Sequence, residues 1–159
     1  MPAPNTLGFA SHNHANCVSD ALAEAEAVCK SKGLQFTKSR RRVLEILLSE
    51  HKAMGAYDIL AKLGEEGVAA QPPVAYRALD FLVSHGLAPK VEKLSAYIAC
   101  TLRGADHAPV FFICRTCETV AEEAQSAPLG AAAQAAGFQI ETAVVEAEGL
   151  CPDCQKDTV

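Results

Sequence analysis

Two pairs of cysteines constrain this chain more than any other feature. Cys114-x-x-Cys117 and Cys151-x-x-Cys154 stand on either side of a 33-residue segment. Each pair can present two sulfurs to one ion, and four thiolates suit tetrahedral zinc, which has no redox chemistry. Two disulfides or a redox pair are the alternatives, but a thioredoxin-like pair opens a helix after a strand, whereas Cys114 ends an apolar run. The spacing therefore predicts a closed structural zinc site that is not catalytic.

The composition favours a metal-binding protein of a reducing compartment. The 159 residues include seven cysteines, an odd number and too low a density for a disulfide scaffold. No apolar run reaches the roughly 18 residues needed to span a bilayer, and the first residues lack the pattern of a signal peptide. We therefore expect a cytoplasmic protein with no membrane partner.

The charge is divided between the two halves of the chain. Residues 1–99 carry 11 basic and 10 acidic side chains, whereas residues 100–159 carry 3 and 9. Six basic residues, with no acidic one among them, lie from Lys30 to Arg42. A local basic stripe is the footprint of a domain that binds nucleic acid. The asymmetry predicts two domains with different partners.

The first half has the element order of a winged helix-turn-helix domain. The predicted elements are helices over 20–32, from Thr37, over 55–65 and over 71–85, followed by strands over 87–91 and 96–101. The helix at 71–85 stands in the recognition position. We therefore expect a flexible tail over 1–19 and a winged-helix DNA-binding domain over 20–102.

The second half predicts a small α/β domain, so the whole chain is of the α+β class. The predicted elements are strands over 110–114 and 119–123, a helix over 125–136, and a strand in which Phe138, Ile140, Thr142 and Val144 alternate. The expected boundaries are a hinge over 103–109, this domain over 110–155 and a tail over 156–159. A unit of about 50 residues is too small to be stable alone. It needs a metal, a dimer partner or both.

A second set of potential metal ligands lies near the junction of the halves. It consists of Cys100, His107, Glu122 or Glu123, and His85. Ligands from both domains and the hinge would let one ion hold the domains in one orientation, as a metal switch requires. A thiolate with imidazole and carboxylate suits zinc better than manganese or magnesium. Taken singly, Cys100 is more often a small buried apolar side chain, and His107 an ordinary loop residue.

Five further potential ligands point to no clear site. We expect His12, His14 and Cys17 to be solvated tail residues that bind metal weakly at most, and Cys29 to lie in the core; the fifth is His51. The sequence shows no Ser-His-Asp set, phosphate-binding loop or paired-acid pattern, so we expect no enzyme and no small-molecule substrate.

The helix at 71–85 predicts a DNA-reading surface. Arg77 on its outer face can contact guanine O6 and N7 in the major groove, or instead pair with a nearby aspartate. Tyr76 can contact a phosphate or a thymine methyl group, and Tyr57 can approach the backbone; partial burial is the alternative for both tyrosines. The basic run can contact phosphates, or can be a solvated helix face; it includes Lys38, Arg40, Arg41 and Arg42.

Several motifs together resemble the ferric uptake regulator family, and most closely its zinc uptake regulator branch. They are Ala56-Tyr57-Asp58-Ile59-Leu60, the run Pro72-Pro73-Val74-Ala75-Tyr76-Arg77-Ala78-Leu79-Asp80-Phe81-Leu82, Lys90-Val91-Glu92, and the two cysteine pairs with Gly149-Leu150-Cys151. They occur in the expected order, and the likeness covers about residues 20–155.

The resemblance implies a zinc-responsive repressor. It implies a homodimer that binds palindromic double-stranded operator DNA and represses zinc-uptake genes, with two zinc ions per chain. It assigns structural zinc to Cys114, Cys117, Cys151 and Cys154, and regulatory zinc to Cys100, His107 and Glu122 with one further ligand. A regulator of the same family that senses iron, manganese or peroxide, a thiol-disulfide enzyme and a zinc-binding interaction module remain as alternatives.

The chain departs from the pattern of this branch at two places. A histidine usually precedes Lys90, and here Pro89 takes its place. Either His85, one helical turn upstream, supplies the fourth ligand, or the regulatory site has three protein ligands. The usual Thr-Val before Tyr76-Arg77 is Val74-Ala75, so a hydroxyl that could cap the helix or contact phosphate is missing.

Overall fold

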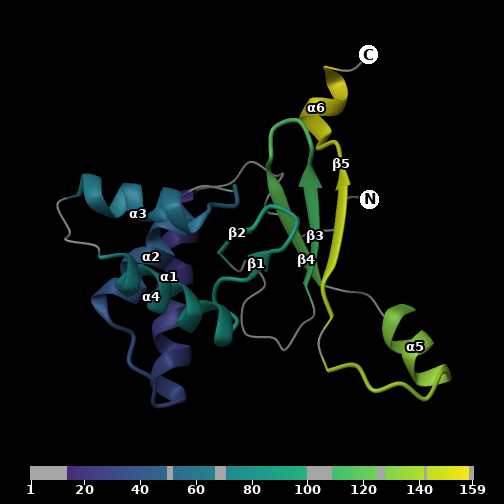
Figure 1. Cartoon of the computed structure of the whole chain (residues 1–159), viewed down its shortest axis with the longest axis horizontal. Coiled ribbons are helices and arrows are strands. Elements are labelled where there is room, and N and C mark those ends of the chain that lie inside the picture. The colour runs from purple at the N-terminus through teal and green to yellow at the C-terminus, as the bar shows by residue number, and fades with distance from the viewer. Residues whose placement is uncertain are drawn as a thin grey trace.

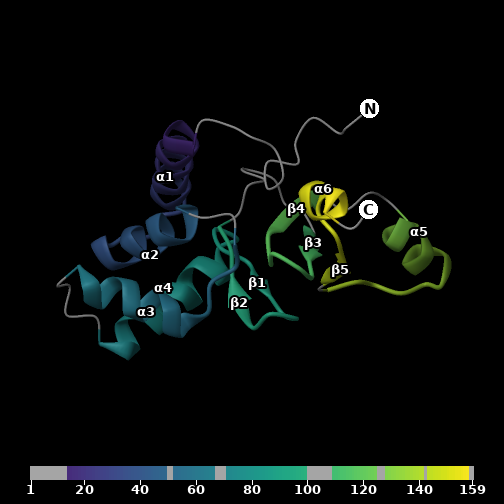
Figure 2. The same ribbon diagram turned by 90° about the horizontal axis from the view of Figure 1, so that it is seen from above.

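The protein divides into a helical part and a sheet. The structure, a computed structural model, describes residues 14–49, 52–66, 71–99, 109–124, 128–141 and 143–157. In Figure 1 the helices of the N-terminal part gather on the left, a sheet stands on the right, and a short hairpin lies between them. Figure 2, seen from above, keeps this order. None of the helices in these residues is long and apolar enough to cross a membrane.

Four helices build the head, as we call residues 14–99. They are α1 (His14–Ser31), α2 (Lys38–Leu48), α3 (Ala56–Glu65) and α4 (Pro72–Ser84). Helix α2 begins where the sequence predicts, because the Thr37 hydroxyl accepts a hydrogen bond from the Arg40 N–H at 3.3 Å. Prolines at the first positions of α4 fit there, since those N–H groups lack helical partners.

Helix α1 differs from the prediction at its start. It begins at His14, six residues before the predicted first residue Asp20, so residues 14–19 are helical rather than tail. The physical reason is packing, because Val18 lies against the core of the head. That core is formed by buried apolar residues of all four helices, with Leu47, Ile59, Leu79 and Leu82 fully enclosed.

The wing is the antiparallel hairpin of β1 (Lys90–Val91) and β2 (Ala96–Tyr97). Both strands are shorter than predicted. The wing is fixed to the rest of the head at both sides. Met54 and Tyr97 exchange two backbone hydrogen bonds of 2.8 Å, and the Leu87 N–H donates to the Leu82 carbonyl of α4 at 2.8 Å. The wing therefore moves with α4.

The sheet has the order β4-β3-β5, from β3 (Pro109–Cys114), β4 (Val120–Ala124) and β5 (Val145–Gly149). Strand β4 is antiparallel to β3, and β5 is parallel to it, with Cys114 opposite Gly149. Helix α5 (Pro128–Ala135) stands apart from the sheet, and α6 (Pro152–Lys156) follows β5 directly (Figure 1).

The predicted strand at 138–144 is wrong. The strand is β5, which begins at Val145, and residues 138–141 form no strand. Apolar alternation indicates a strand only where one face meets a core. Here Phe138 is 67% exposed and Val144 is 51% exposed, so this segment covers no core formed by the described residues. Thr142 lies outside the described residues.

The wing packs against the sheet through a joint core. This cluster consists of Val91 and Ile98 from the wing segment with Phe111, Ile113 and Val120 from the sheet, all buried. A further backbone bridge joins Lys52 of the head to Thr119, next to β4. The two halves therefore share apolar packing, and this packing fixes the orientation of the head.

Candidate metal centre and nucleic-acid interface

The fold brings the two cysteine pairs to one end of the sheet. Cys114 is the last residue of β3, and Cys151 caps the N-terminus of α6 directly after β5. Because β3 and β5 are parallel, their carboxyl ends meet, and the Arg115 N–H donates to the Gly149 carbonyl at 2.9 Å. The turn after β3 is tight, since Glu118 adopts a left-handed conformation with φ of 60°.

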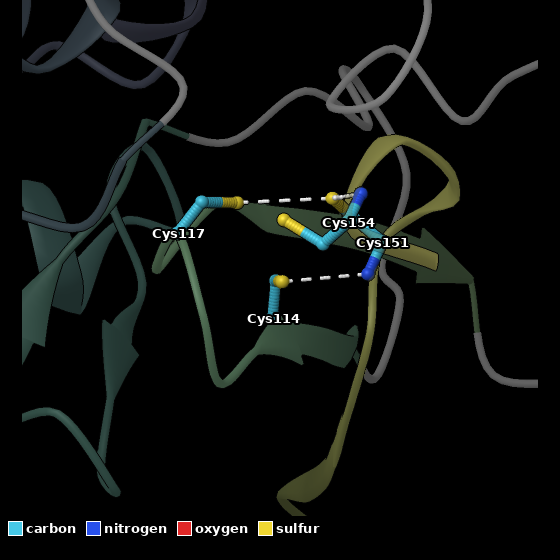
Figure 3. Close-up of side chains that lie close together, drawn as sticks. All are labelled: Cys114, Cys117, Cys151 and Cys154. Atoms are coloured by element: carbon cyan, nitrogen blue, oxygen red, sulfur yellow. Dashed lines mark hydrogen bonds between the residues drawn. The ribbon is translucent and has the colours of Figure 1, made fainter. Parts of the chain in front are cut away.

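The four sulfurs face one another in the geometry of a zinc site. The Sγ atoms of Cys114, Cys117, Cys151 and Cys154 all lie within 4.8 Å of one another (Figure 3). Those of Cys117 and Cys151 are 3.7 Å apart. Zinc–sulfur bonds of about 2.3 Å in a tetrahedron give an edge of about 3.8 Å. The residues therefore fit zinc, and the sulfurs are too far apart for a disulfide.

The protein favours the thiolate form at the first cysteine pair. Backbone N–H groups lower the pKa of Cys114 to about 6; that of Cys117 contributes most, and that of Cys151 lies 3.4 Å from the Cys114 sulfur. A hydrogen bond with the Thr119 hydroxyl, 3.2 Å away, lowers the pKa of Cys117. These groups stabilise negative charge on two of the four sulfurs.

Cys154, the last of the four cysteines, has its thiol favoured over its thiolate. Hydrogen bonding with Cys151, together with burial, raises the pKa of Cys154 to about 12. Four neighbouring thiolates repel one another, so the set is fully ionised only beside a cation. The site thus favours a divalent metal. It is the one such cluster of three or more potential ligands among the residues that the structure describes.

The second predicted ligand set is only partly visible. Cys100 and His107 lie outside the described residues, as do His12 and His51. Glu122 is 3% exposed and lies opposite Phe111 in the register of β3 and β4, so its side chain is on the sheet face that meets the wing. Its neighbour Glu123 has one buried carboxylate oxygen without a hydrogen bond.

The remaining candidate ligands lie in the head. His85 caps the C-terminus of α4, and its ring lies against that of Phe81 in a tilted arrangement, with centroids 4.6 Å apart. It belongs to no metal-type cluster of the described residues. Cys29 is buried in α1, where burial raises the pKa of its thiol, and Cys17 is half-buried in the same helix. His14 is the first residue of α1.

The outer face of α4 is exposed, as a DNA-reading helix requires. Arg77 is exposed and forms no hydrogen bond or ion pair with the part of the chain that the structure describes. Tyr76 on the same helix is half-exposed, and Tyr57 at the start of α3 is 85% exposed. An aromatic side chain this open on a monomer is available to a partner.

The basic run is less free than its charge indicates. Arg40 lies over the Phe81 ring at 3.7 Å from its centroid and donates to the Gln35 carbonyl. Arg41 pairs with Glu26 at 3.2 Å and Glu45 at 3.3 Å. Lys38 is exposed and makes no such interaction with the described residues.

Arg42 ties α2 to α3. It pairs with Glu45 at 2.6 Å and with Glu66 just after α3, and these hydrogen bonds raise the pKa of Arg42 and lower that of Glu66. The sequence shows the positive charge of this run but not its partners, which lie up to 24 residues away. Thr119 is also not predicted as part of the metal site; a hydroxyl two residues after Cys117 is its only signal.

The fold and the cysteine site define a metal-binding winged-helix protein. The family model of the ferric uptake regulator family matches residues 31–147. The chain is 37% identical over 139 residues to the zinc uptake regulation protein of Escherichia coli (strain K12), covering 85% of this chain and 81% of that protein. This chain belongs to the ferric uptake regulator family, and its likeness is to the zinc uptake regulator branch.

Solved structures agree with that assignment. A zinc uptake regulator in complex with zinc and DNA superposes with a TM-score of 0.80 at 34% identity, over 89% of this chain and 97% of that one. Holo XcZur gives a TM-score of 0.78 at 35% identity, over 87% and 99%. Apo XcZur gives only 0.53 at 33% identity, over 88% and 99%. The structure described here is thus more similar to holo than to apo XcZur.

Proposed function

We propose that this protein is a zinc-dependent transcriptional repressor. In this proposal the zinc-loaded homodimer binds palindromic operator DNA and represses zinc-uptake genes. The observation that carries the proposal is the pairing of an exposed recognition helix with a four-cysteine metal centre, in an arrangement that matches a zinc uptake regulator bound to zinc and DNA. The chain's own chemistry is binding rather than catalysis, and its place is the cytoplasm.

The proposal assigns DNA contacts to the exposed face of the head. Arg77 reads a guanine in the major groove, because its exposed guanidinium has no partner among the described residues and bidentate contact with O6 and N7 suits it. Tyr57 and Tyr76 contact the backbone or a thymine methyl group. Lys38, Arg40 and Arg41 contact phosphates, and Arg41 does so by exchanging Glu26 and Glu45 for DNA.

Two zinc ions per chain are part of the proposal. The first binds Cys114, Cys117, Cys151 and Cys154 and closes the end of the sheet. The second binds Cys100, His107 and Glu122, with water or His85 as a fourth ligand, since Pro89 offers none. Support comes from Glu122, a buried carboxylate on the face of the sheet that meets the wing. Bound zinc supplies a positive charge that lets these groups ionise together.

A second copy of the chain accounts for the exposed apolar side chains of the C-terminal half. Leu129 in α5 is 40% exposed, and Phe138, Ile140 and Val144 are also open to solvent. Helix α5 stands away from its own sheet (Figures 1 and 2). An apolar helix and an alternating apolar segment without a core of their own favour burial in a dimer interface.

Selection of DNA tests the function. Purified full-length protein is mixed with fragmented genomic DNA at two buffered free-zinc concentrations, and the retained fragments are sequenced. Zinc-dependent enrichment of a palindrome near metal-transporter genes is the expected result. Enrichment at both zinc levels would show a regulator that answers to another signal. No enrichment at either level would replace the repressor by a zinc-binding interaction module.

A variant of the sensor site refines this test. Cys100→Ser is expected to fold and to keep one zinc per chain, but to bind the operator equally at both zinc levels, because it lacks the thiolate of the second site. A coupling free energy of about 1–3 kcal/mol per site is typical, so two sites in a dimer together change affinity by about 25-fold to about 20,000-fold. A full zinc response of this variant would remove Cys100 from the sensor.

A further inference from the structure

The tip of the wing is held by two acidic side chains of β5. The Glu146 carboxylate accepts hydrogen bonds from two consecutive backbone N–H groups of the wing turn, that of Glu92 at 2.5 Å and that of Lys93 at 2.9 Å. The Glu148 carboxylate lies 2.8 Å from the ammonium group of Lys93. We call these four residues the wing clamp.

The register of the sheet explains why these two glutamates reach the wing. Glu146 lies opposite Phe111 in the parallel ladder, and Glu148 lies opposite Ile113. Directly paired residues of neighbouring strands share a face. The two glutamates therefore lie on the same face as the joint core, at its edge on β5. Apolar packing at the centre and charge-assisted hydrogen bonds at the edge together dock the wing on the sheet.

The wing clamp occupies the groups that a wing would offer to DNA. Two adjacent N–H groups with a lysine form a typical binding place for a phosphate. Here a carboxylate accepts both N–H groups, and a second one pairs with the lysine. The turn thus binds the anionic edge of its own sheet. It serves as a joint between the two halves of the chain.

The position of the wing on the sheet determines the position of the recognition helix α4. The wing is bonded to α4 through Leu87 and Ala88, whose N–H groups both donate to the Leu82 carbonyl, at 2.8 and 3.2 Å. Ala88 is fully buried. A shift of the wing against β5 is therefore a shift of α4 against the sheet. The TM-score is 0.78 against holo XcZur and 0.53 against apo XcZur, so this structure lies nearer to the holo arrangement of that protein.

We propose that Glu146 is a positioning residue, which sets the orientation of the recognition helix by binding the wing turn. This inference rests on the proposed function and extends it: the second half orients the reading surface through a protein contact as well as through a metal. In a dimer the angle between head and sheet determines the distance between the two recognition helices. Glu146 then determines which half-site spacing the dimer accepts.

The test compares Glu146→Ala and the isosteric Glu146→Gln with the wild-type protein, all zinc-loaded and full-length. Glu65→Gln is the matched control, because Glu65 is exposed at the end of α3, lies outside the wing and the sheet, and has no partner among the described residues. The readouts are amide hydrogen exchange at residues 92 and 93 without DNA, affinity for the operator obtained by selection, and affinity for operators whose half-site spacing is changed by one or two base pairs.

In Glu146→Ala we expect the amides of Glu92 and Lys93 to exchange at least about tenfold faster, since an exposed turn has no other acceptor for them. Operator affinity is expected to fall about five- to 150-fold, the range of a typical coupling between sites. The preference for the native spacing should shrink. Zinc content and binding to a single half-site should stay unchanged, and Glu146→Gln should be intermediate.

Three results would overturn the proposal. Free exchange of both amides in the wild-type protein would show that the wing clamp does not exist. Faster exchange in both Glu146 variants with unchanged affinity and spacing preference would show that the clamp positions nothing. Loss of protection throughout β3 and β5 in both variants would make Glu146 a residue that only stabilises the sheet. If the wild-type protein selects no DNA at all, the proposed function fails and takes the positioning role with it, while amide exchange still decides whether the clamp forms.

Discussion

Loss of one zinc thiolate should unfold the sheet while the head stays folded. The perturbation is Cys117→Ser, which leaves three of the four sulfurs. Only three large side chains of the sheet, Phe111, Ile113 and Val120, enter the joint core. Their burial supplies about 5–9 kcal/mol in total at 1.5–3 kcal/mol each. Zinc in a small structural site contributes about 10–16 kcal/mol, so the metal is the larger of the two contributions.

The assay is amide exchange with a parallel measurement of zinc by mass spectrometry. In Cys117→Ser we expect less than one tightly bound zinc at the four-cysteine site and lost protection over β3 and β5, while α4 keeps its protection because the head has a separate core. Cys17→Ser, a change of the same kind in α1, is the control and should keep both. A zinc-free Cys117→Ser protein whose β3 remains protected would refute the reasoning, because apolar packing would then suffice.

Three further predictions concern pH and DNA. The pKa of Cys114 is lowered to about 6, so its thiolate stabilises the folded state above the ordinary thiol pKa, and this stabilisation is lost as the pH falls through about 6. Zinc release to a colorimetric chelator should therefore rise below pH 6. Unchanged zinc retention at pH 5 would contradict this prediction. Arg77→Ala should cost about 1–3 kcal/mol of operator binding and relax specificity at one base pair, whereas an equal loss on unrelated DNA would assign Arg77 to a phosphate. Lys38→Ala should reduce the slope of the logarithm of DNA affinity against the logarithm of salt concentration by about 1. Arg41→Ala should reduce this slope by less, because the ion pairs of Arg41 with Glu26 and Glu45 compete with DNA. Equal slopes for the two variants would rule out that competition.

The parts of the fold that depend on neighbouring residues were predictable from the sequence. Thr37 caps α2 through a contact three residues away, and the prolines of α4 mark its start. The cysteine pairs were also predictable, because each pair is local and the chemistry of four thiolates restricts what joins them. In each of these features the residues that interact lie only a few positions apart, so a short stretch of sequence is enough to predict the structure.

The features that depend on distant partners were not predictable. The alternation from Phe138 to Val144 lacks a core in its own chain, so periodicity placed the strand several residues too early. The ion pair of Arg42 with Glu66 spans 24 residues, and the contact of Glu146 with the wing spans 54. A charge in a sequence carries no indication of such partners, because docking of the wing on the sheet brings them together.

The parallel pairing of β3 with β5 also fixes an order of events during synthesis. A parallel pair needs a crossover, so β5, the strand that completes the sheet, leaves the ribosome only after β4 and α5 have been made. At 5–20 residues per second, the 33 residues between Cys117 and Cys151 take about 2–7 s to make. Through that interval the nascent chain carries a complete head and only the first of the two cysteine pairs of the zinc site. A chain released before β5 is made would keep a folded head but would lack the β5 glutamates that dock its wing. Docking of the head on the sheet therefore depends on the strand that is made last.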